Sequence, residues 1–347
     1  MAYRLHRWRH VTSQRWALPL AALSLGWAAR QLLRRATQTD LRGQVVLITG
    51  SSRGLGLALA REVARAGCRL VLCARDADGL ERARQEMAAL GASVLAVPCD
   101  VSDRAQVRSL VQNATERFGR IDVLINNAGI ISVGPLEMLT LEDFERSMGV
   151  MFWGGVYTTF EVLPQMRARH QGRIVNITSI GGKVSVPHLL GYGAAKFAAV
   201  GFSEGLRAEL ARDGIVVTTI VPGLMRTGSH LNALFKGQHR QEFGWFSLGA
   251  SLPLTSMSAE AAARRIVTAL ERGESEVILT WQARLLSTVH GVLPGLTVDI
   301  LSLVNRALPA PGGIGQAAAT GHASRSPITD SPLEVLGRRA AAELNQP

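Results

Sequence analysis

The chain has 347 residues, 47% of them hydrophobic, and carries a formal net charge of +11. This size suits one large domain with appendages or two small domains. The charge does not indicate nucleic-acid binding, because seven arginines precede the first acidic residue, Asp40, and no basic stripe is interleaved with aromatic residues.

Residues 1–40 form a basic arm around an apolar segment, Trp16 to Ala29, that has arginines on both sides. A helix that spans a bilayer needs roughly 20 apolar residues, and this segment is shorter. Arginines also follow it where a secretory cleavage site would need small residues. Tryptophan and arginine at its borders are typical of a segment lying on an anionic membrane face. We therefore expect a membrane-associating arm with the folded domain on the cytoplasmic side. A short span, a helix packed on the folded core and a soluble cytoplasmic protein are the alternatives.

From residue 41 to about residue 280, short apolar runs rich in β-branched residues alternate with amphipathic stretches. Such alternation predicts an α/β fold, a doubly wound parallel sheet with helices on both faces. The expected strands are 45–49, 69–73, 93–97, 123–126, 173–178, 215–221 and 276–279, and the expected helices are 55–66, 78–90, 104–118, 144–169 and 192–212.

Two smaller features belong to these elements. Asp78 and Glu81 are expected to form a capping box at the start of the second helix. Cys68, Cys73 and Cys99 lie in or beside predicted strands and lack metal-ligand spacing, so we expect buried free thiols in a reducing compartment and no metal.

The first predicted strand runs directly into a glycine-rich loop, Thr49-Gly50-Ser51-Ser52-Arg53-Gly54-Leu55-Gly56, and then into a helix. Glycines let the backbone turn tightly and approach a pyrophosphate, and the helix N-terminus offers free N–H groups to it. The loop therefore predicts a dinucleotide site, with a plain strand-to-helix turn as the alternative.

Charge indicates which dinucleotide is bound. A site for NAD usually has an acid after the second strand, whereas NADP needs cations for its 2′-phosphate. Here Arg75 follows the second strand and Arg53 lies in the glycine loop, so NADP(H) is preferred over NAD(H). Asp76 argues against this preference unless it caps the next helix.

Tyr192 and Lys196 are four residues apart, and Ser179 lies thirteen residues before the tyrosine. Four residues are about one helical turn, so the phenol and the ammonium share one face, about 6 Å apart along the axis. A nearby positive charge lowers the pKa of a tyrosine and makes it a usable acid near neutral pH. An isolated pair of this kind would otherwise be a solvated helix face.

Together with Asn126-Asn127-Ala128-Gly129 and Pro222-Gly223, these motifs resemble the classical short-chain dehydrogenase/reductase family over about residues 41–280, in particular its membrane-associated NADP-dependent members. The resemblance implies a Rossmann-fold catalytic domain in which Tyr192 transfers the proton, Lys196 holds the nicotinamide ribose and Ser179 binds the substrate oxygen. It also implies homo-oligomers. The residues expected to bind the cofactor are Gly50, Ser52, Arg53, Gly54, Leu55, Gly56, Arg75, Asp100, Val101, Asn126, Ala128, Gly129, Tyr192, Lys196, Pro222, Gly223 and Thr227. Thr178 should point to the opposite face of its strand and be structural.

Met151 departs from the family pattern, since it stands where an asparagine usually holds a relay water behind the lysine. A thioether is at best a weak acceptor. The leading interpretation is a hydride-transferring oxidoreductase, and a catalytically weak NADP-binding scaffold or redox sensor is the alternative.

Three later segments bear on the substrate. Residues 228–257 occupy the family's variable lid and contain nine large apolar residues, Leu231, Leu234, Phe235, Phe243, Trp245, Phe246, Leu248, Leu252 and Leu254. Such a lid favours a lipophilic carbonyl or alcohol of steroid-like, retinoid-like or long-chain type, unless its side chains pack on the core or a partner. Residues 281–308 form an apolar helical region that caps the pocket or lies on a membrane. Residues 309–347 are expected to be a flexible linker and a short terminal helix.

Overall fold

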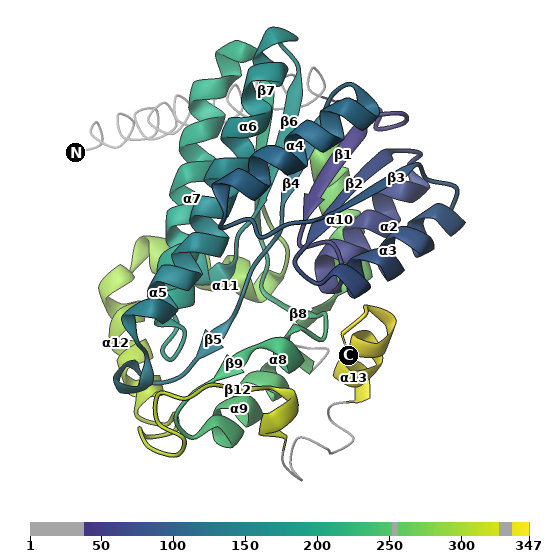
Figure 1. The fold of residues 1–347 in the computed structure, drawn as a ribbon. Helices are drawn as coiled ribbons and strands as arrows, with labels where there is room; N and C mark the ends of the chain where they lie inside the picture. Colours follow the sequence, from purple (N-terminus) through teal and green to yellow (C-terminus); the bar gives the residue numbers. More distant parts are fainter. Residues whose placement is uncertain (1–37, 252–255, 326–334, 347) are drawn as a thin grey trace, which may run out of the picture.

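The centre of the computed structural model is a parallel sheet of seven strands, in the order β11-β7-β6-β4-β1-β2-β3 (Figure 1). The structure describes residues 38–251, 256–325 and 335–346, so the apolar part of the N-terminal arm and Leu252 and Leu254 of the lid lie outside the described residues. The strands are β1 (Val45–Thr49), β2 (Arg69–Ala74), β3 (Val94–Pro98), β4 (Val123–Asn126), β6 (Gly172–Ile177), β7 (Ile215–Val221) and β11 (Glu276–Ile278).

Helices cover both faces of this sheet, which confirms the predicted α/β class (Figure 1). One face is covered by α2 (Gly54–Arg65), α3 (Ala77–Ala89) and α10 (Ala259–Arg272), and the other by α4 (Arg104–Phe118), α6 (Gly154–Ala168) and α7 (Leu190–Leu210). Because both faces are covered, every residue of β1 is buried. The odd-numbered side chains Val45 and Leu47 join one core, while Val46 and Ile48 join the other.

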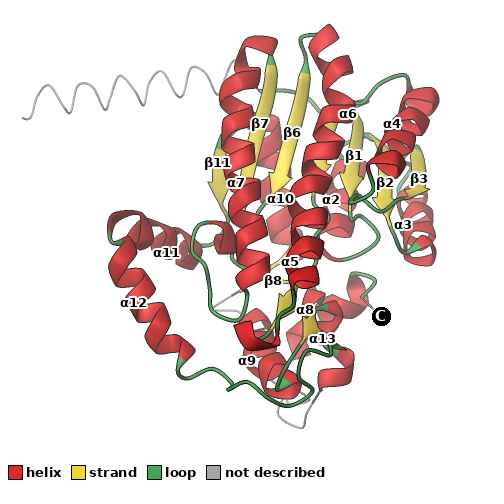
Figure 2. Cartoon of the chain, turned by 60° about the vertical axis from the view of Figure 1, so that its left-hand side comes forward, coloured by secondary structure: helices red, strands yellow, loops and turns green. Residues whose placement is uncertain are grey.

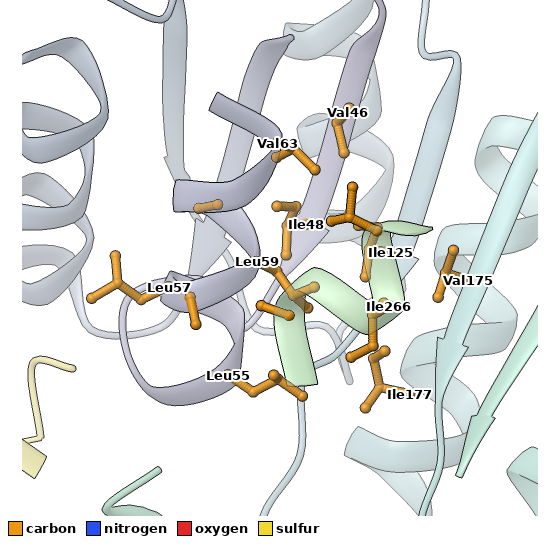
Figure 3. Packing of buried hydrophobic residues seen from close by; sticks show 14 of the residues in the cluster. Val46, Ile48, Leu55, Leu57, Leu59, Val63, Ile125, Val175, Ile177 and Ile266 are labelled. Atoms are coloured by element: carbon orange, nitrogen blue, oxygen red, sulfur yellow. The ribbon is translucent and has the colours of Figure 1, made fainter. Parts of the chain in front are cut away.

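The core under α2 and α10 is built from branched aliphatic side chains. Figure 3 shows Ile266 of α10 beside Ile125 of β4, with Leu59 of α2 close by. All three side chains are buried completely. Burial of one such side chain stabilises the fold by about 1.5–3 kcal/mol, and this packing fixes α2, and with it the glycine loop, against the sheet.

The sequence placed most elements within two residues, and two local predictions were wrong. The helix expected over 144–169 is interrupted: α5 (Leu141–Met148) and α6 are joined by a π-helical turn, η2 (Gly149–Trp153). A Cβ at Gly154 would lie 2.8 Å from Val101, so the glycine permits this close approach. The cap of α3 is Asp76, whose side chain accepts a hydrogen bond from Gly79 N, and Asp78 lies inside the first turn.

The strand order reverses at β1, which has β2 on one side and β4 on the other. In open α/β sheets, ligands bind beyond the carboxyl ends of the strands at such a switch point. The glycine loop follows β1 and the Asn126–Gly129 motif follows β4, so both motifs meet at this edge.

Shorter elements close the space beyond that edge. They are β5 (Ser132–Val133), β8 (Leu224–Arg226), α8 (Ser229–Asn232), β9 (Leu234–Phe235), α9 (His239–Ser251), β10 (Ser256–Ser258), β12 (Ala319–Thr320) and α13 (Val335–Glu343). β12 belongs to the segment expected to be a linker, yet it pairs antiparallel with β9 and ties that segment to the lid. Helix α13 packs against α9 and β8 (Figure 1).

The apolar region 281–308 forms two helices, α11 (Trp281–Val292) and α12 (Pro294–Asn305), which extend from the side of the body (Figure 2). Several of their large apolar side chains are exposed, including Trp281 at 70% and Val292 at 72%. Within the described ranges, no helix is both long enough and apolar enough to cross a membrane.

Candidate active site

The glycine loop is packed so tightly that side chains could not replace its glycines. Gly50 has a φ of +65°, and a Cβ there would lie 2.8 Å from the Cα of Ala128. A Cβ at Gly56 would lie 2.1 Å from the carbonyl oxygen of Gly50. The first turn of α2 therefore packs directly on the loops that follow β1 and β4, and its N-terminus faces the switch point.

Two residues within the quoted motifs join the loops after β1 and β4. The Thr49 hydroxyl accepts hydrogen bonds from the backbone N of Asn127 at 2.9 Å and of Ala128 at 3.0 Å. The Asn127 side chain donates to the carbonyl oxygens of Thr49 at 2.9 Å and Gly50 at 3.0 Å. The sequence analysis assigned no role to either side chain, although both lie inside the motifs.

A cavity of about 510 Å³ opens at this edge. All predicted site residues except Asn126 line it, and they come from the glycine loop, α7 and the segments that follow β2, β3, β4, β6, β7 and β8. Asn126 lies on a neighbouring small cavity instead. Its side-chain amide donates to Asn176 Oδ1 at 2.9 Å and its oxygen accepts from Thr158 at 2.6 Å.

Ser179, Tyr192 and Lys196 converge on one wall of the large cavity. Ser179 follows β6, and its hydroxyl is hydrogen-bonded to Tyr192 and accepts from Gly181 N at 3.0 Å. Lys196 Nζ lies 5.8 Å from the centre of the Tyr192 ring and donates to the carbonyl oxygen of Ile177 at 2.9 Å. Thr178 is turned away, with its hydroxyl donating to Ile220 O at 2.6 Å.

Burial controls the charges of this group. Desolvation raises the pKa of Tyr192, and the hydrogen bond with Ser179 opposes that rise. Desolvation also lowers the pKa of Lys196 to about 8. The helical spacing alone indicated a lowered tyrosine pKa, but in the folded chain burial raises the pKa and outweighs the hydrogen bond with Ser179. The phenol is consequently held protonated at neutral pH.

Known proteins share these features. A family model described as short chain dehydrogenase matches residues 44–234. This chain belongs to the short-chain dehydrogenase/reductase family. A curated relative in Anopheles gambiae, "Dehydrogenase/reductase SDR family protein 7-like", is 40% identical over 245 residues, which cover 69% of this chain and 75% of that protein.

Two solved structures show the same fold. A short-chain dehydrogenase/reductase from Burkholderia phymatum, solved in complex with NAD, is 25% identical with a TM-score of 0.67, and the match covers 74% of this chain and 96% of that one. L-Sorbose reductase from Gluconobacter frateurii, solved with NADPH and L-sorbose, is 28% identical with a TM-score of 0.62, covering 69% of this chain and 97% of that one. The chain is thus an oxidoreductase of a family that uses NAD or NADP on small-molecule substrates.

The cavity fits such a cofactor, because Gly50, Gly54 and Gly56 let the loop backbone line it and arginines flank it. Burial lowers the pKa of the Arg53 guanidinium, while the carboxylate of Asp76 raises it. Asp76 itself is engaged by the N-terminus of α3, as its capping role requires. Arg75 is more exposed and lies 3.7 Å from Asp100.

Met151 lies in the π-helical turn and is 6% exposed. Its thioether lies close to Gly129, 3.8 Å from the position of a Cβ there. Together with Asn126 and Asn176 it lines the small cavity of about 20 Å³. A cavity of this size holds one water molecule.

The lid differs from the expectation of a wholly apolar substrate cover. Phe235, Phe243 and Leu231 are buried in a small core of their own, and of the lid's large apolar side chains in the described residues only Leu234 lines the cavity. Asn232 and Gln346, which were not predicted from the sequence, line the same cavity. Nothing in the sequence pattern singles out Gln346, because it lies far along the chain from every motif.

Proposed function

We propose that this protein transfers a hydride between NADP(H) and the carbonyl or secondary alcohol of a lipophilic small molecule, with Tyr192 as the general acid and base. The observation that carries this proposal is the convergence of Tyr192, Ser179 and Lys196 on the wall of the cavity that the glycine loop also lines. The nicotinamide supplies or accepts the hydride.

The three side chains divide the remaining work. The Tyr192 hydroxyl gives its proton to the substrate oxygen as a carbonyl is reduced, and the hydroxyl of Ser179 donates a hydrogen bond that stabilises the developing charge. One N–H of the Lys196 ammonium donates to Ile177 O, and the other two can donate to the nicotinamide ribose. Because burial keeps the pKa of Tyr192 raised, its resting form is the acid, which favours reduction.

Reprotonation of Tyr192 needs a path that does not use an asparagine at position 151. The small cavity beside Met151 lies next to Asn126 and Asn176 and has room for one water. We therefore propose that a water held there takes part in the relay.

The preference for NADP rests on Arg53 and Arg75, which both line the cavity, and on the engagement of Asp76 as a helix cap. The NADPH complex of the sorbose reductase is compatible with this preference, and the NAD complex of the Burkholderia protein is the counterexample. Dissociation constants for NADPH and NADH test it. Arg75→Ala should weaken NADPH binding while leaving NADH binding within about threefold, since only the 2′-phosphate is lost from recognition.

A lipophilic substrate is supported by Ile130, Ile131 and Leu234, which line the cavity beyond the catalytic wall. Exposed apolar side chains on α11 and α12 support a membrane surface as the source of that substrate. Deleting residues 1–36 should release the protein from membranes while it still binds cofactor. If the truncated protein still sediments with vesicles, α11 and α12 hold it there, or the arm has no such role.

Homo-oligomerisation is part of the same proposal. Trp153 is 45% exposed and Phe160 on α6 is 61% exposed, and such apolar side chains on a helix surface fit contact with a second copy. Sedimentation velocity of wild type and of Phe160→Glu measures it, with a smaller species expected for the variant.

Turnover decides between the enzyme and the scaffold that Met151 suggests. Purified protein is incubated with NADPH and a panel of hydrophobic ketones and aldehydes, and absorbance at the nicotinamide band is followed. Turnover that Tyr192→Phe abolishes without changing cofactor affinity supports the enzyme. If the wild type binds cofactor tightly without turnover, and Met151→Asn gains turnover, the scaffold is supported.

A further inference from the structure

The last residues of the chain lie across the glycine loop. Leu344 is completely buried, and its carbonyl oxygen accepts a hydrogen bond from Gly54 N at 2.9 Å. Asn345 Nδ2 donates to the carbonyl oxygen of Ser52 at 3.4 Å. In Figure 1 the carboxy terminus and α13 are seen beneath the glycine-loop side of the sheet, next to β8. The tail is thus a wall of the cofactor cavity.

Gln346 completes that wall with a chain of side-chain hydrogen bonds. Its Nε2 donates to the carbonyl oxygen of Thr227 at 3.1 Å, and its Oε1 accepts from Asn232 Nδ2 at 2.6 Å. Asn232 Oδ1 in turn accepts from Arg53 at 3.1 Å. The two ends fix both amide orientations, because the carbonyl of Thr227 can only accept and the guanidinium of Arg53 can only donate.

This orientation leaves unused N–H donors on the cavity side of the hydrogen-bond chain formed by Arg53, Asn232 and Gln346. Both amide oxygens already accept a hydrogen bond, while Gln346 and Asn232 each keep one N–H and Arg53 keeps four. Arg53 has no ion pair within 4 Å among the described residues, and burial lowers its pKa. Buried donors beside a desolvated cation are the chemistry of an anion site.

The position of Gln346 indicates which anion. Its Nε2 lies 3.0 Å from where a Cβ at Gly54 would be, at the first turn of α2. A dinucleotide that occupies this cavity places its diphosphate at that turn. Gln346 lines the cavity and is only 7% exposed, so its amide is largely shielded from bulk solvent.

We propose that Gln346, supplied by the carboxy-terminal tail and oriented by Asn232, binds the cofactor's diphosphate. This inference rests on the use of NAD or NADP by the site and adds a contact from beyond the catalytic domain. The tail thereby contributes part of the cavity wall.

The test measures dissociation constants of NADPH and NADH by nicotinamide fluorescence, on the full chain and without substrate. Gln346→Ala should weaken the binding of both cofactors about tenfold to hundredfold, the value of roughly one hydrogen bond to a charged group. Gln346→Glu keeps the size but places a carboxylate against the diphosphate, and it should weaken both further. Arg339→Ala, at an exposed position of α13, is the matched control and should change neither constant.

Amide hydrogen exchange measures the protection of the tail and does not depend on the dissociation constants. Amide hydrogen exchange of the peptide containing residues 340–346 should slow when NADPH or NADH binds to the wild type. Unchanged constants for both Gln346 variants, or tighter binding by Gln346→Ala, overturn the proposal, the latter because the tail would then compete with the cofactor. A loss confined to NADPH also overturns it and moves the contact to the 2′-phosphate. Failure of the wild type to bind either cofactor would instead refute the assigned cofactor chemistry.

Discussion

Replacing Lys196 by methionine should abolish catalysis and yet make the protein more stable at pH 7. Lys196 is 5% exposed, and among the contacts described it has one hydrogen bond and no carboxylate partner. A buried ammonium without a counter-charge loses hydration that a single carbonyl oxygen does not replace. Methionine has a similar length and no charge, so it fills the same space without that cost.

The size of the effect follows from the pKa values. Burial lowers the pKa of Lys196 from 10.5 to about 8. The gap of about 2.5 corresponds to about 3.4 kcal/mol, at about 1.36 kcal/mol for each unit. Loss of the hydrogen bond leaves Ile177 O unpaired, which costs about 1–3 kcal/mol. The net gain for Lys196→Met is about 0.4–2.4 kcal/mol, or a rise in Tm of up to several degrees.

The pH dependence gives this prediction its sharpest test. The folded pKa is below the unfolded one, so the folded wild type is penalised in full below about pH 8, and the penalty disappears as pH rises from about 8 to 10.5. Urea unfolding of wild type and Lys196→Met without cofactor at pH 7 and 9.5 should show the advantage of the variant shrinking by about 2 kcal/mol.

Lys183 provides the matched control. Burial lowers its pKa, but ion pairs with Glu204 at 2.7 Å and Glu276 at 2.6 Å outweigh burial and raise the pKa overall. Lys183→Met should therefore lose stability, by an amount that is the same at pH 7 and 9.5. The reasoning on Lys196 is refuted if Lys196→Met is less stable than wild type at pH 7 by a margin independent of pH.

Four further substitutions test local packing and pairing in the fold. Gly56→Ala should lower the free energy of unfolding in urea by more than about 3 kcal/mol and abolish cofactor binding, because its Cβ would meet the Gly50 carbonyl oxygen. Gly201→Ala, on the open face of α7, should raise the free energy of unfolding by about 0.5–1 kcal/mol. Asp143→Asn should cost about 3–5 kcal/mol at pH 7 because it leaves buried Lys236 without its carboxylate. Burial alone would raise the pKa of Asp143, but the hydrogen bond from Lys236 keeps it lowered, so acid titration should show the difference fading as pH falls below 3.8. Asn176→Ala should lower Tm by several degrees in a thermal scan, since the Asn126 amide loses its partner.

The sequence was informative where function depends on a short stretch of chain. The glycine loop of Gly50 to Gly56 and the one-turn spacing of Tyr192 and Lys196 are local patterns, and the local geometry of a turn or a helix determines what they present. Alternating apolar runs likewise predicted the parallel sheet, because a strand buried on both faces must be apolar throughout. These patterns fixed the family and most of the residues that line the cavity.

Other features could not be found in this way, since they depend on how distant segments pack. Asn126 was assigned to the cofactor from its motif, but the fold brings Asn176 and Thr158 to its side chain and places it on the small cavity. The lid aromatics predicted an apolar substrate cover, yet Phe235 and Phe243 pack on each other.

By itself the sequence determined the order of the elements, the glycine loop and the one-turn spacing of Tyr192 and Lys196, because each depends on residues that are neighbours along the chain. Only the tertiary structure decided that burial raises the pKa of Tyr192 and that Gln346 lines the cavity. The desolvation of a side chain and the set of residues that line a cavity are properties of the packed molecule. They are set by which atoms exclude water from a site, and those atoms come from every part of the chain.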